Sequence, residues 1–178
     1  MLRIAVFAIF ISLAFSYYYF PLYKQCDSRW GSQALGTGGG RTICQAGCLI
    51  SSAAMALSGI GQNYNPETLN NWLINNGGYW NGNLFIWRSI DSLGLSFDGF
   101  ISNSAIKSSL DSNKIVIINV RNGGHYVLAT GYSGDTIFVE DPGYWTHSYH
   151  LSSIISGNTG VYSATRMRTV ASSWVESI

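Results

Sequence analysis

The sequence predicts an α+β fold in which helices pack on one side of an antiparallel sheet. Two observations lead to this class. Apolar residues recur with helical spacing in the first half of the chain, whereas β-branched runs and a hairpin signal occur in the second half. Helical patterns followed by strand patterns are typical of this layered arrangement. A length of 178 residues suits one domain with its own core.

The first predicted helix begins at or near Cys48, after Gly47, and Gly59 and Gly61 end it. Its apolar face consists of Ile50, Ala53, Ala54 and Leu57. Cys48 therefore lies in the first turn of a mostly buried helix. Backbone N–H groups and the positive end of the helix dipole lie there, and reactive cysteines use such an environment. The alternative is a small buried cysteine that only packs.

Three further helices are expected from local signals. Asn65 caps the second, Pro66 takes its first position, and Gly77 follows its end. The third covers residues 84–93, and Ser104 caps a short fourth helix that ends at residue 110.

Strand patterns begin at residue 115. Residues 115–120 are β-branched and apolar almost throughout, which predicts a buried strand. Residues 126–131 and 136–140 form a hairpin around the Ser133-Gly134-Asp135 turn. Residues 161–167 provide the last predicted strand.

His125 and Asp141 lie at the open end of this hairpin. A turn at Ser133-Gly134 places His125 opposite residue 142, and a turn at Gly134-Asp135 places it opposite residue 144. Asp141 comes close to His125 in either register. A carboxylate there can accept a hydrogen bond from one imidazole nitrogen and leave the other for a thiol. Alternatively, His125 is a polar residue at a strand edge and Asp141 initiates a turn.

The N-terminal residues resemble a secretory signal peptide. Arg3 supplies a positive charge, residues 4–15 are apolar, and Ala14 and Ser16 are small residues before a possible cleavage site. Cleavage after Ser16 would remove residues 1–16 and release residues 17–178 as one domain with no stable membrane association. The alternative is an uncleaved anchor, because the uncharged residues 4–20 reach the lower limit of about 17–25 residues for a membrane span.

The chain contains three cysteines, namely Cys26, Cys44 and Cys48. In an oxidising compartment an odd count implies one disulfide and one thiol. Because the helix start favours Cys48 as the thiol, we predict a disulfide between Cys26 and Cys44. A Cys44–Cys48 bridge is the alternative, and it would consume the thiol.

The composition excludes some classes of function. Charged residues make up 11% of the chain and the net charge is +1, so no electrostatic footprint for nucleic acid is present. Cys44 and Cys48 have a spacing that zinc ligands allow, but no second close pair of ligands completes a site. We therefore predict no metal and no other cofactor.

A family resemblance now becomes specific. It is carried by Tyr23-Lys24-Gln25 with Asp27, Arg29 and Trp30, by Gly47-Cys48, by Gly124-His125-Tyr126-Val127, and by Asp141-Pro142-Gly143-Tyr144. These motifs resemble the double-glycine (bacteriocin-processing) peptidase-like family of papain-like cysteine peptidases. The resemblance covers residues 22–165. It implies a papain-like fold with Cys48 as nucleophile, His125 as general base and Asp141 as the acid that orients it.

One position departs from the family pattern. Papain-like enzymes place a glutamine a few residues before the cysteine, where it donates to the oxyanion. Thr42 stands six residues before Cys48, so Gln25 is the better candidate and Gln45 the second. Residues 31–40 would then be an insertion between Gln25 and the helix. Trp80, Trp87 and Tyr144 are candidates for lining the cleft, with core packing as the alternative.

The expected function is therefore that of a secreted cysteine peptidase acting on a peptide or protein through an acyl-enzyme. The expected location is extracellular or, alternatively, the lumen of a secretory or digestive compartment. Two alternatives stay open at this point. One is a cell-wall hydrolase with the same residues acting on peptidoglycan peptides, and the other is a non-catalytic binding or structural domain that keeps the fold.

Overall fold

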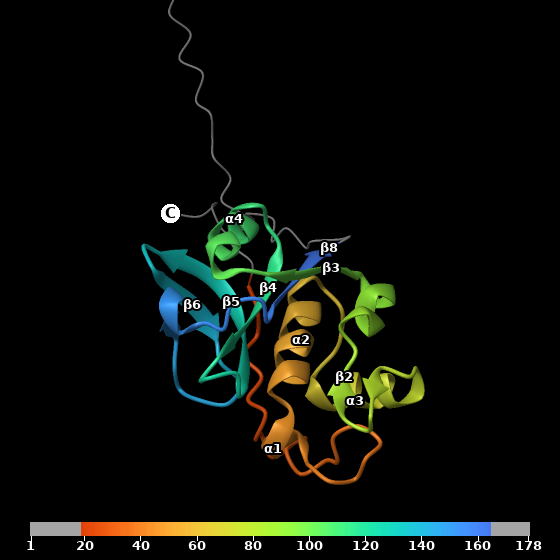
Figure 1. Cartoon of the computed structure of the whole chain (residues 1–178). Coiled ribbons are helices and arrows are strands. Elements are labelled where there is room, and N and C mark those ends of the chain that lie inside the picture. The colour runs from red at the N-terminus through yellow and green to blue at the C-terminus, as the bar shows by residue number, and fades with distance from the viewer. Residues whose placement is uncertain (1–18, 165–178) are drawn as a thin grey trace, which may run out of the picture.

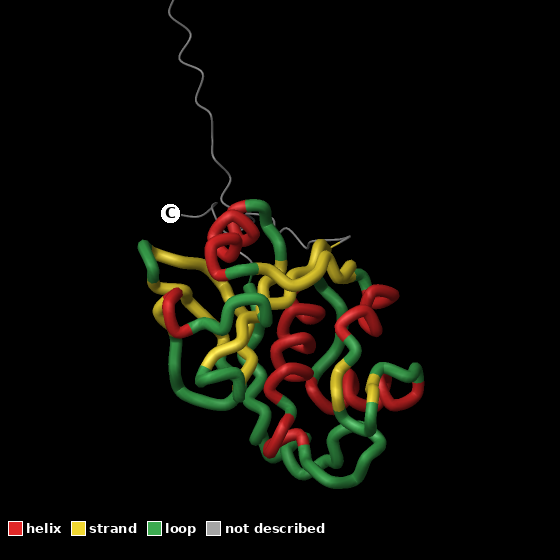
Figure 2. Tube along the Cα trace, in the orientation of Figure 1, coloured by secondary structure: helices red, strands yellow, loops and turns green. Residues whose placement is uncertain are grey.

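The computed structural model describes residues 19–164, in which helices and long loops precede a group of antiparallel strands (Figures 1 and 2). The predicted signal peptide, residues 1–16, lies outside this part. The α-helices are α1 (Ile43–Ala46), α2 (Cys48–Gly59), α3 (Pro66–Asn75) and α4 (Ile106–Asp111), and the 3-10 helices are η1 (Trp87–Leu93), η2 (Asn103–Ala105) and η3 (Leu151–Ser153). The strands are β1 (Tyr79–Trp80), β2 (Leu84–Phe85), β3 (Leu95–Ile101), β4 (Ile115–Val120), β5 (His125–Ser133), β6 (Thr136–Glu140), β7 (Ser148–His150) and β8 (Thr159–Ala164).

The main sheet has six strands in the order β3-β8-β4-β5-β6-β7, and every neighbouring pair is antiparallel. Strands β1 and β2 form a separate small hairpin. Because the helices α1, α2 and α3 precede this sheet in sequence and α2 packs against it, the structure confirms the predicted α+β class.

Two apolar clusters fill the two faces of the sheet. Residues of β4 divide between them, since Ile115 and Ile117 join the cluster around α2, whereas Val116, Ile118 and Val120 join the other. All six β4 residues are buried, as the β-branched run predicted. Ile106 of α4 belongs to the second cluster, so α4 covers the face opposite α2. The expectation of helices on one side only is therefore wrong for α4.

Helix α2 lies between α3 and the strands β4 and β5 (Figure 1). Its residues from Ile50 to Leu57 are all buried, and most of them are small, so the helix backbone can approach the sheet closely. The hydroxyl of Ser52 donates a hydrogen bond of 3.3 Å to the backbone oxygen of Tyr126. The helix that begins at Cys48 is thereby joined to the strand that begins at His125.

Local signals correctly predicted α3, for which Asn65 caps the helix and Pro66 occupies the first turn. The helix expected over residues 84–93 is wrong in its first part, because Leu84 and Phe85 pair with β1 and only η1 follows. Strand β3 was not predicted. Strand β8 confirms the strand expected over residues 161–167 as far as residue 164, and residues 165–167 lie outside the described part of the chain. No helix between residues 19 and 164 combines the length and hydropathy needed to cross a membrane.

Candidate active site

Cys48 is the first residue of α2 and lines a cleft between the helix and the sheet. Two helices meet just before it, because Gly47 ends α1 and caps α2. A Cβ atom at Gly47 would lie 2.5 Å from the backbone oxygen of Ile43, so only glycine fits this junction without rearrangement. The first N–H groups of α2 have no acceptors within the helix, and they lie at the same end of the helix as Cys48.

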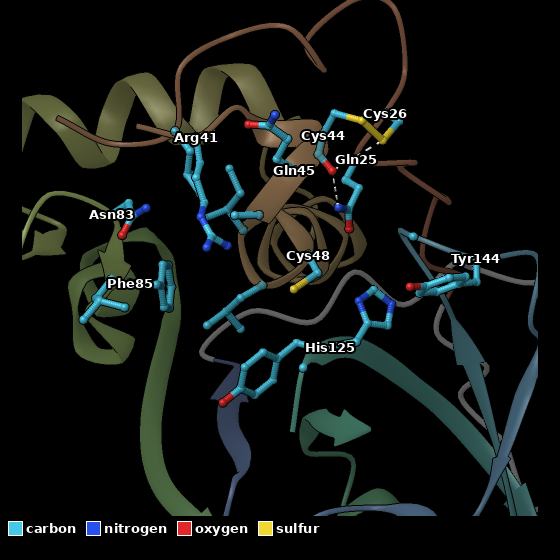
Figure 3. Close-up of a pocket in the computed structure, with 18 of the residues that line it drawn as sticks. Gln25, Cys26, Arg41, Cys44, Gln45, Cys48, Asn83, Phe85, His125 and Tyr144 are labelled. Atoms are coloured by element: carbon cyan, nitrogen blue, oxygen red, sulfur yellow. Dashed lines mark hydrogen bonds between the residues drawn. A yellow bond between two sulfur atoms is a disulfide. The ribbon is translucent and has the colours of Figure 1, made fainter. Parts of the chain in front are cut away.

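His125 is the first residue of β5 and is 5% exposed. Its Nε2 lies 2.7 Å from Oδ1 of Asp141. Cys48 also acts on the imidazole, because it helps to raise the pKa of the ring, and since Nε2 is engaged by Asp141, Nδ1 is the atom left for the sulfur. Figure 3 shows the Cys48 sulfur beside the imidazole ring. The structure thus brings together the three predicted residues in the order thiol, imidazole and carboxylate.

The hairpin register explains this alignment. Near the turn, Ser133 pairs with Thr136 and Tyr132 with Ile137, which is the register of the Gly134-Asp135 alternative. A bulge between Ala129 and Gly131 then shifts the pairing by one residue. Neither simple register predicted from the turn therefore extends to His125, although both correctly placed Asp141 beside it.

Asp141 is enclosed by donors, and its side chain is 0% exposed. Its Oδ1 accepts hydrogen bonds from the backbone N–H groups of Gly143 at 2.8 Å and Tyr144 at 2.9 Å. Its Oδ2 accepts a 2.7 Å hydrogen bond from the hydroxyl of Tyr149. Burial alone would raise the pKa of Asp141, but these donors and His125 together hold it below its usual value.

The charge of His125 follows from the same partners. Burial alone would lower its pKa, yet the hydrogen bonds to Asp141 and Cys48 and the attraction of both groups raise it from 6.5 to about 9. Asp141 and Cys48 thus favour the imidazolium form of His125 over the neutral ring. A positively charged imidazole beside a cysteine is the arrangement in which a thiolate acts as a nucleophile.

Tyr149 and Arg121 form a further layer behind Asp141, and sequence analysis did not single them out. The Nε of Arg121 donates to the Tyr149 hydroxyl at 3.3 Å, and its guanidinium carbon lies 3.5 Å from the ring centroid of Tyr144. The Tyr144 ring meets the His125 ring edge to face at 5.1 Å. These contacts join segments far apart in the sequence, so no local pattern could have revealed them.

Gln25 lies on the opposite wall of the cleft. Its side-chain Nε2 donates a 2.6 Å hydrogen bond to the backbone oxygen of Cys44, and its backbone N–H donates to Pro142 O at 2.9 Å. The Nε2 group has a second N–H donor, whereas Oε1 is buried and has no hydrogen-bond partner among the described residues. The second candidate, Gln45, uses its Oε1 to accept from the backbone N–H of Thr42 in the capping box of α1.

The structure contains a disulfide between Cys26 and Cys44 and leaves Cys48 as a free cysteine. This is the predicted pairing rather than the Cys44–Cys48 alternative. The bond joins the residue after Gln25 to the helix α1, whose end leads directly into Cys48. Closing a loop of this length stabilises the fold by about 3 kcal/mol in the chain-entropy model.

The cleft has a volume of about 530 Å³. Besides the residues already placed there, its walls include Leu35, Arg41, Leu49, Asn83, Leu84, Phe85, Gly124, Tyr126 and Tyr144. Tyr144 thus lines the cleft, whereas Trp80 is 67% exposed elsewhere and Trp87 packs among Phe85, Phe97 and Tyr162. Between residues 19 and 164, no three potential metal ligands of the His, Cys, Asp or Glu type gather at one place.

Comparisons with known proteins agree with this geometry. Residues 17–170 match the Peptidase_C39 like family. A double glycine motif protease from an AMS/PCAT transporter, crystallised with its leader peptide, has a similar fold, with a TM-score of 0.54, 16% identity, and coverage of 85% of this chain and 96% of the other.

A second solved structure, of a C39-like peptidase from Bacillus anthracis, has a TM-score of 0.50, 16% identity, and coverage of 84% and 96% of the two chains. No curated protein matches the sequence. Since the family match covers most of the chain and the solved structures share its fold, the chain belongs to the Peptidase_C39 like family of cysteine peptidases.

Proposed function

We propose that this protein is a secreted cysteine peptidase that hydrolyses peptide bonds through Cys48, His125 and Asp141. The observation that carries the proposal is the bond from His125 Nε2 to Asp141 Oδ1, which leaves the other imidazole nitrogen for the sulfur of Cys48. A group so oriented can hold the thiol proton as an imidazolium and return it to a leaving amine.

The reaction proceeds in two stages. The Cys48 thiolate attacks the scissile carbonyl carbon, and the resulting oxyanion accepts hydrogen bonds from the Gln25 amide and the Cys48 backbone N–H. His125 then protonates the leaving amine as the C–N bond breaks, which leaves an acyl-enzyme. Water, deprotonated by His125, releases the acyl group and restores the thiol–imidazole pair.

Two observations support a secreted location. The first 16 residues have the charge and apolar pattern of a signal peptide, and the disulfide between Cys26 and Cys44 is a bond that persists in oxidising compartments. Expression of the full chain with N-terminal sequencing of the product tests this. A secreted protein that begins at residue 17 is expected, and a product retained in the membrane with residues 1–16 intact would contradict it.

A peptide is the first substrate class to test, because the double glycine motif protease with a similar fold was crystallised with a leader peptide. The purified protein would be assayed on an unstructured protein and on purified peptidoglycan, which separates the peptidase from the cell-wall alternative. We expect the Cys48→Ala and His125→Ala variants to lose at least about a thousandfold in kcat/KM.

The matched control is His147→Ala, because His147 is exposed on the same half of the molecule and does not line the cleft. We expect it to retain wild-type turnover. Normal turnover by the Cys48→Ala protein would overturn the assignment, and loss of activity in the control would point to a folding defect, which circular dichroism would reveal.

A further inference from the structure

The cleft around Cys48 has an unbalanced charge. The titratable side chains on its walls are those of Cys48, His125, Arg41 and two tyrosines, and no aspartate or glutamate lines it. Arg41 is therefore the one permanently charged residue among the described residues of the lining. Asp141 lies behind His125, with its carboxylate buried and engaged by donors. The cleft therefore presents positive charge to an incoming ligand.

Arg41 differs from the other arginines that the structure describes. Arg29 pairs with Asp27 at 2.8 Å, Arg88 pairs with Asp91 at 3.7 Å, and Arg121 bonds to Tyr149. Within residues 19–164, no carboxylate lies within ion-pair distance of the Arg41 guanidinium. Its five N–H donors are thus available to a ligand.

The backbone at Arg41 is held by its neighbours, and the residue itself is exposed. Its backbone oxygen accepts a 2.8 Å hydrogen bond from Leu35, and the next residue, Thr42, caps α1. Figure 3 shows the guanidinium extending into the cleft beside Phe85, with Cys48 between it and the side of Tyr144. Asn83 also lines the cleft and adds a neutral amide to its wall.

We propose that Arg41 is a specificity-determining residue that binds a carboxylate of the peptide substrate. The proposal rests on the peptidase function proposed above and deepens it by naming the substrate class. A guanidinium holds a carboxylate through two parallel hydrogen bonds, which gives both attraction and a fixed orientation. The substrate residue that carries this carboxylate binds on the side of Cys48 away from Tyr144. The carboxylate belongs either to an acidic side chain or to the C-terminus of the peptide.

A first experiment needs no substrate. Because Cys26 and Cys44 are joined, Cys48 is the one thiol among the three cysteines, and its alkylation can be followed with negatively charged iodoacetate and neutral iodoacetamide. We expect Arg41→Gln to lower the iodoacetate-to-iodoacetamide rate ratio by about threefold at low salt. Arg41→Lys should retain part of the preference, and Arg88→Gln, a matched arginine outside the cleft, should leave the ratio unchanged.

A ratio that does not change in Arg41→Gln would overturn the proposal while leaving the peptidase function intact. Failure of both reagents to alkylate Cys48 would instead overturn both. If Cys48 is alkylated normally but the protein hydrolyses no peptide, the proposed peptidase function is wrong. The iodoacetate-to-iodoacetamide rate ratio then still shows whether Arg41 attracts anions into the cleft.

The second experiment measures kcat/KM on matched peptides. One arm compares glutamate with glutamine at each position of C-terminally amidated peptides, and the other compares free with amidated C-termini. In the arm that contains the recognised carboxylate, we expect the wild type to favour the acid by about tenfold and Arg41→Gln to abolish the preference. A wild-type enzyme that favours neutral peptides in both arms would contradict the proposal.

Discussion

Cys48 and His125 reach the same cleft from two parts of the molecule that hold their side chains in different ways. The helix side is local in sequence, because Gly47 donates its N–H to Ile43 and Ser51 donates to Gly47. On the sheet side, His125 depends on Asp141, and Asp141 depends in turn on Tyr149 and Arg121. One side is fixed by a helix turn and the other by a series of hydrogen bonds between strands and loops.

This difference indicates how each side tolerates change. A helix start either presents the sulfur or fails to fold, so substitutions there should change stability more than turnover. A series of hydrogen bonds can be weakened one bond at a time, so substitutions there should lower turnover by graded amounts. The following predictions test this contrast.

Among the substitutions that test this contrast, Asp141→Asn should have the largest effect, although a smaller one than Cys48→Ala. The asparagine amide keeps a polar group beside His125 but removes the negative charge and favours the wrong imidazole tautomer, so kcat should fall by about a hundred- to a thousandfold with KM little changed. Burial lowers the pKa of His125, and Asp141 is one of the two groups that raise it against this effect to about 9, so the loss of Asp141 should also move the alkaline limb of the kcat/KM profile to lower pH.

Steady-state kinetics between pH 5 and pH 10 check this prediction, and the melting temperature serves as the control for folding. Because the asparagine amide would face the donors that Asp141 accepts from, some loss of stability is expected as well. An unchanged kcat at every pH would show that Asp141 only shapes its turn, and the sheet side would then not be graded in the way we infer.

Gly143→Ala should have the next largest effect. A Cβ atom at Gly143 would lie 2.7 Å from Cε1 of His125 and 3.3 Å from Oε1 of Gln25, so the imidazole must move. A displacement of about 1 Å in a catalytic group costs about a hundredfold in rate. We expect a fall in kcat of this order with little change in the melting temperature, and wild-type kcat would indicate that the ring adjusts without cost.

Tyr149→Phe should have a smaller effect, and Tyr132→Phe is its matched control. Each tyrosine donates its hydroxyl proton to an aspartate, but Tyr149 bonds to the buried Asp141 and Tyr132 bonds to Asp111 at the surface. Removing the Tyr149 hydroxyl raises the pKa of Asp141, because that bond helps to lower it.

For Tyr149→Phe, we therefore expect kcat/KM to fall by about tenfold or less and its acid limb to move to higher pH. The Tyr132→Phe variant should keep the wild-type profile. If both variants had the same pH profile, the Tyr149 hydroxyl would not contribute to the hydrogen bonds that support His125. If Tyr149 had a purely structural role, its substitution would lower the melting temperature without moving the acid limb.

Gly47→Ala should have the smallest effect on turnover per folded molecule. The new Cβ would contact Ile43 on α1 rather than any group in the cleft, so the free energy of unfolding should fall by about 1–3 kcal/mol. Urea denaturation, with kinetics normalised to the thiol titre, separates the two quantities. A larger loss of kcat than in Gly143→Ala would reverse the contrast between the two sides.

The same contrast explains what the sequence could and could not predict of the fold. Helices α2 and α3 were predicted because their caps and apolar spacing are local, and β4 because its run of β-branched residues is continuous. Strand β3 was missed because Gly99 and polar residues interrupt it, and it exists through pairing with the distant β8. The helix expected at residues 84–93 is wrong at Leu84 and Phe85, because these two residues pair with the nearby β1 in a short hairpin.

For the candidate site, the sequence predicted Cys48 from a helix start and His125 with Asp141 from a hairpin. The bulge near Gly131 changed the register without separating them. Tyr149, Arg121 and Arg41 were not predicted, since their roles depend on which side chains meet across the fold. Gln25 was proposed through the family resemblance, and nothing in its local sequence indicates that it faces Cys44.

The disulfide between Cys26 and Cys44 has a practical consequence for any assay of this protein. Thiol enzymes are usually kept in strong reductants that protect the nucleophile, yet such reductants also attack disulfides. Here the bond that would open lies one residue from Gln25 and four residues from Cys48. A buffer chosen to preserve the sulfur of Cys48 would therefore open a covalent link beside Gln25, and a mild reductant or an anaerobic buffer is the better choice.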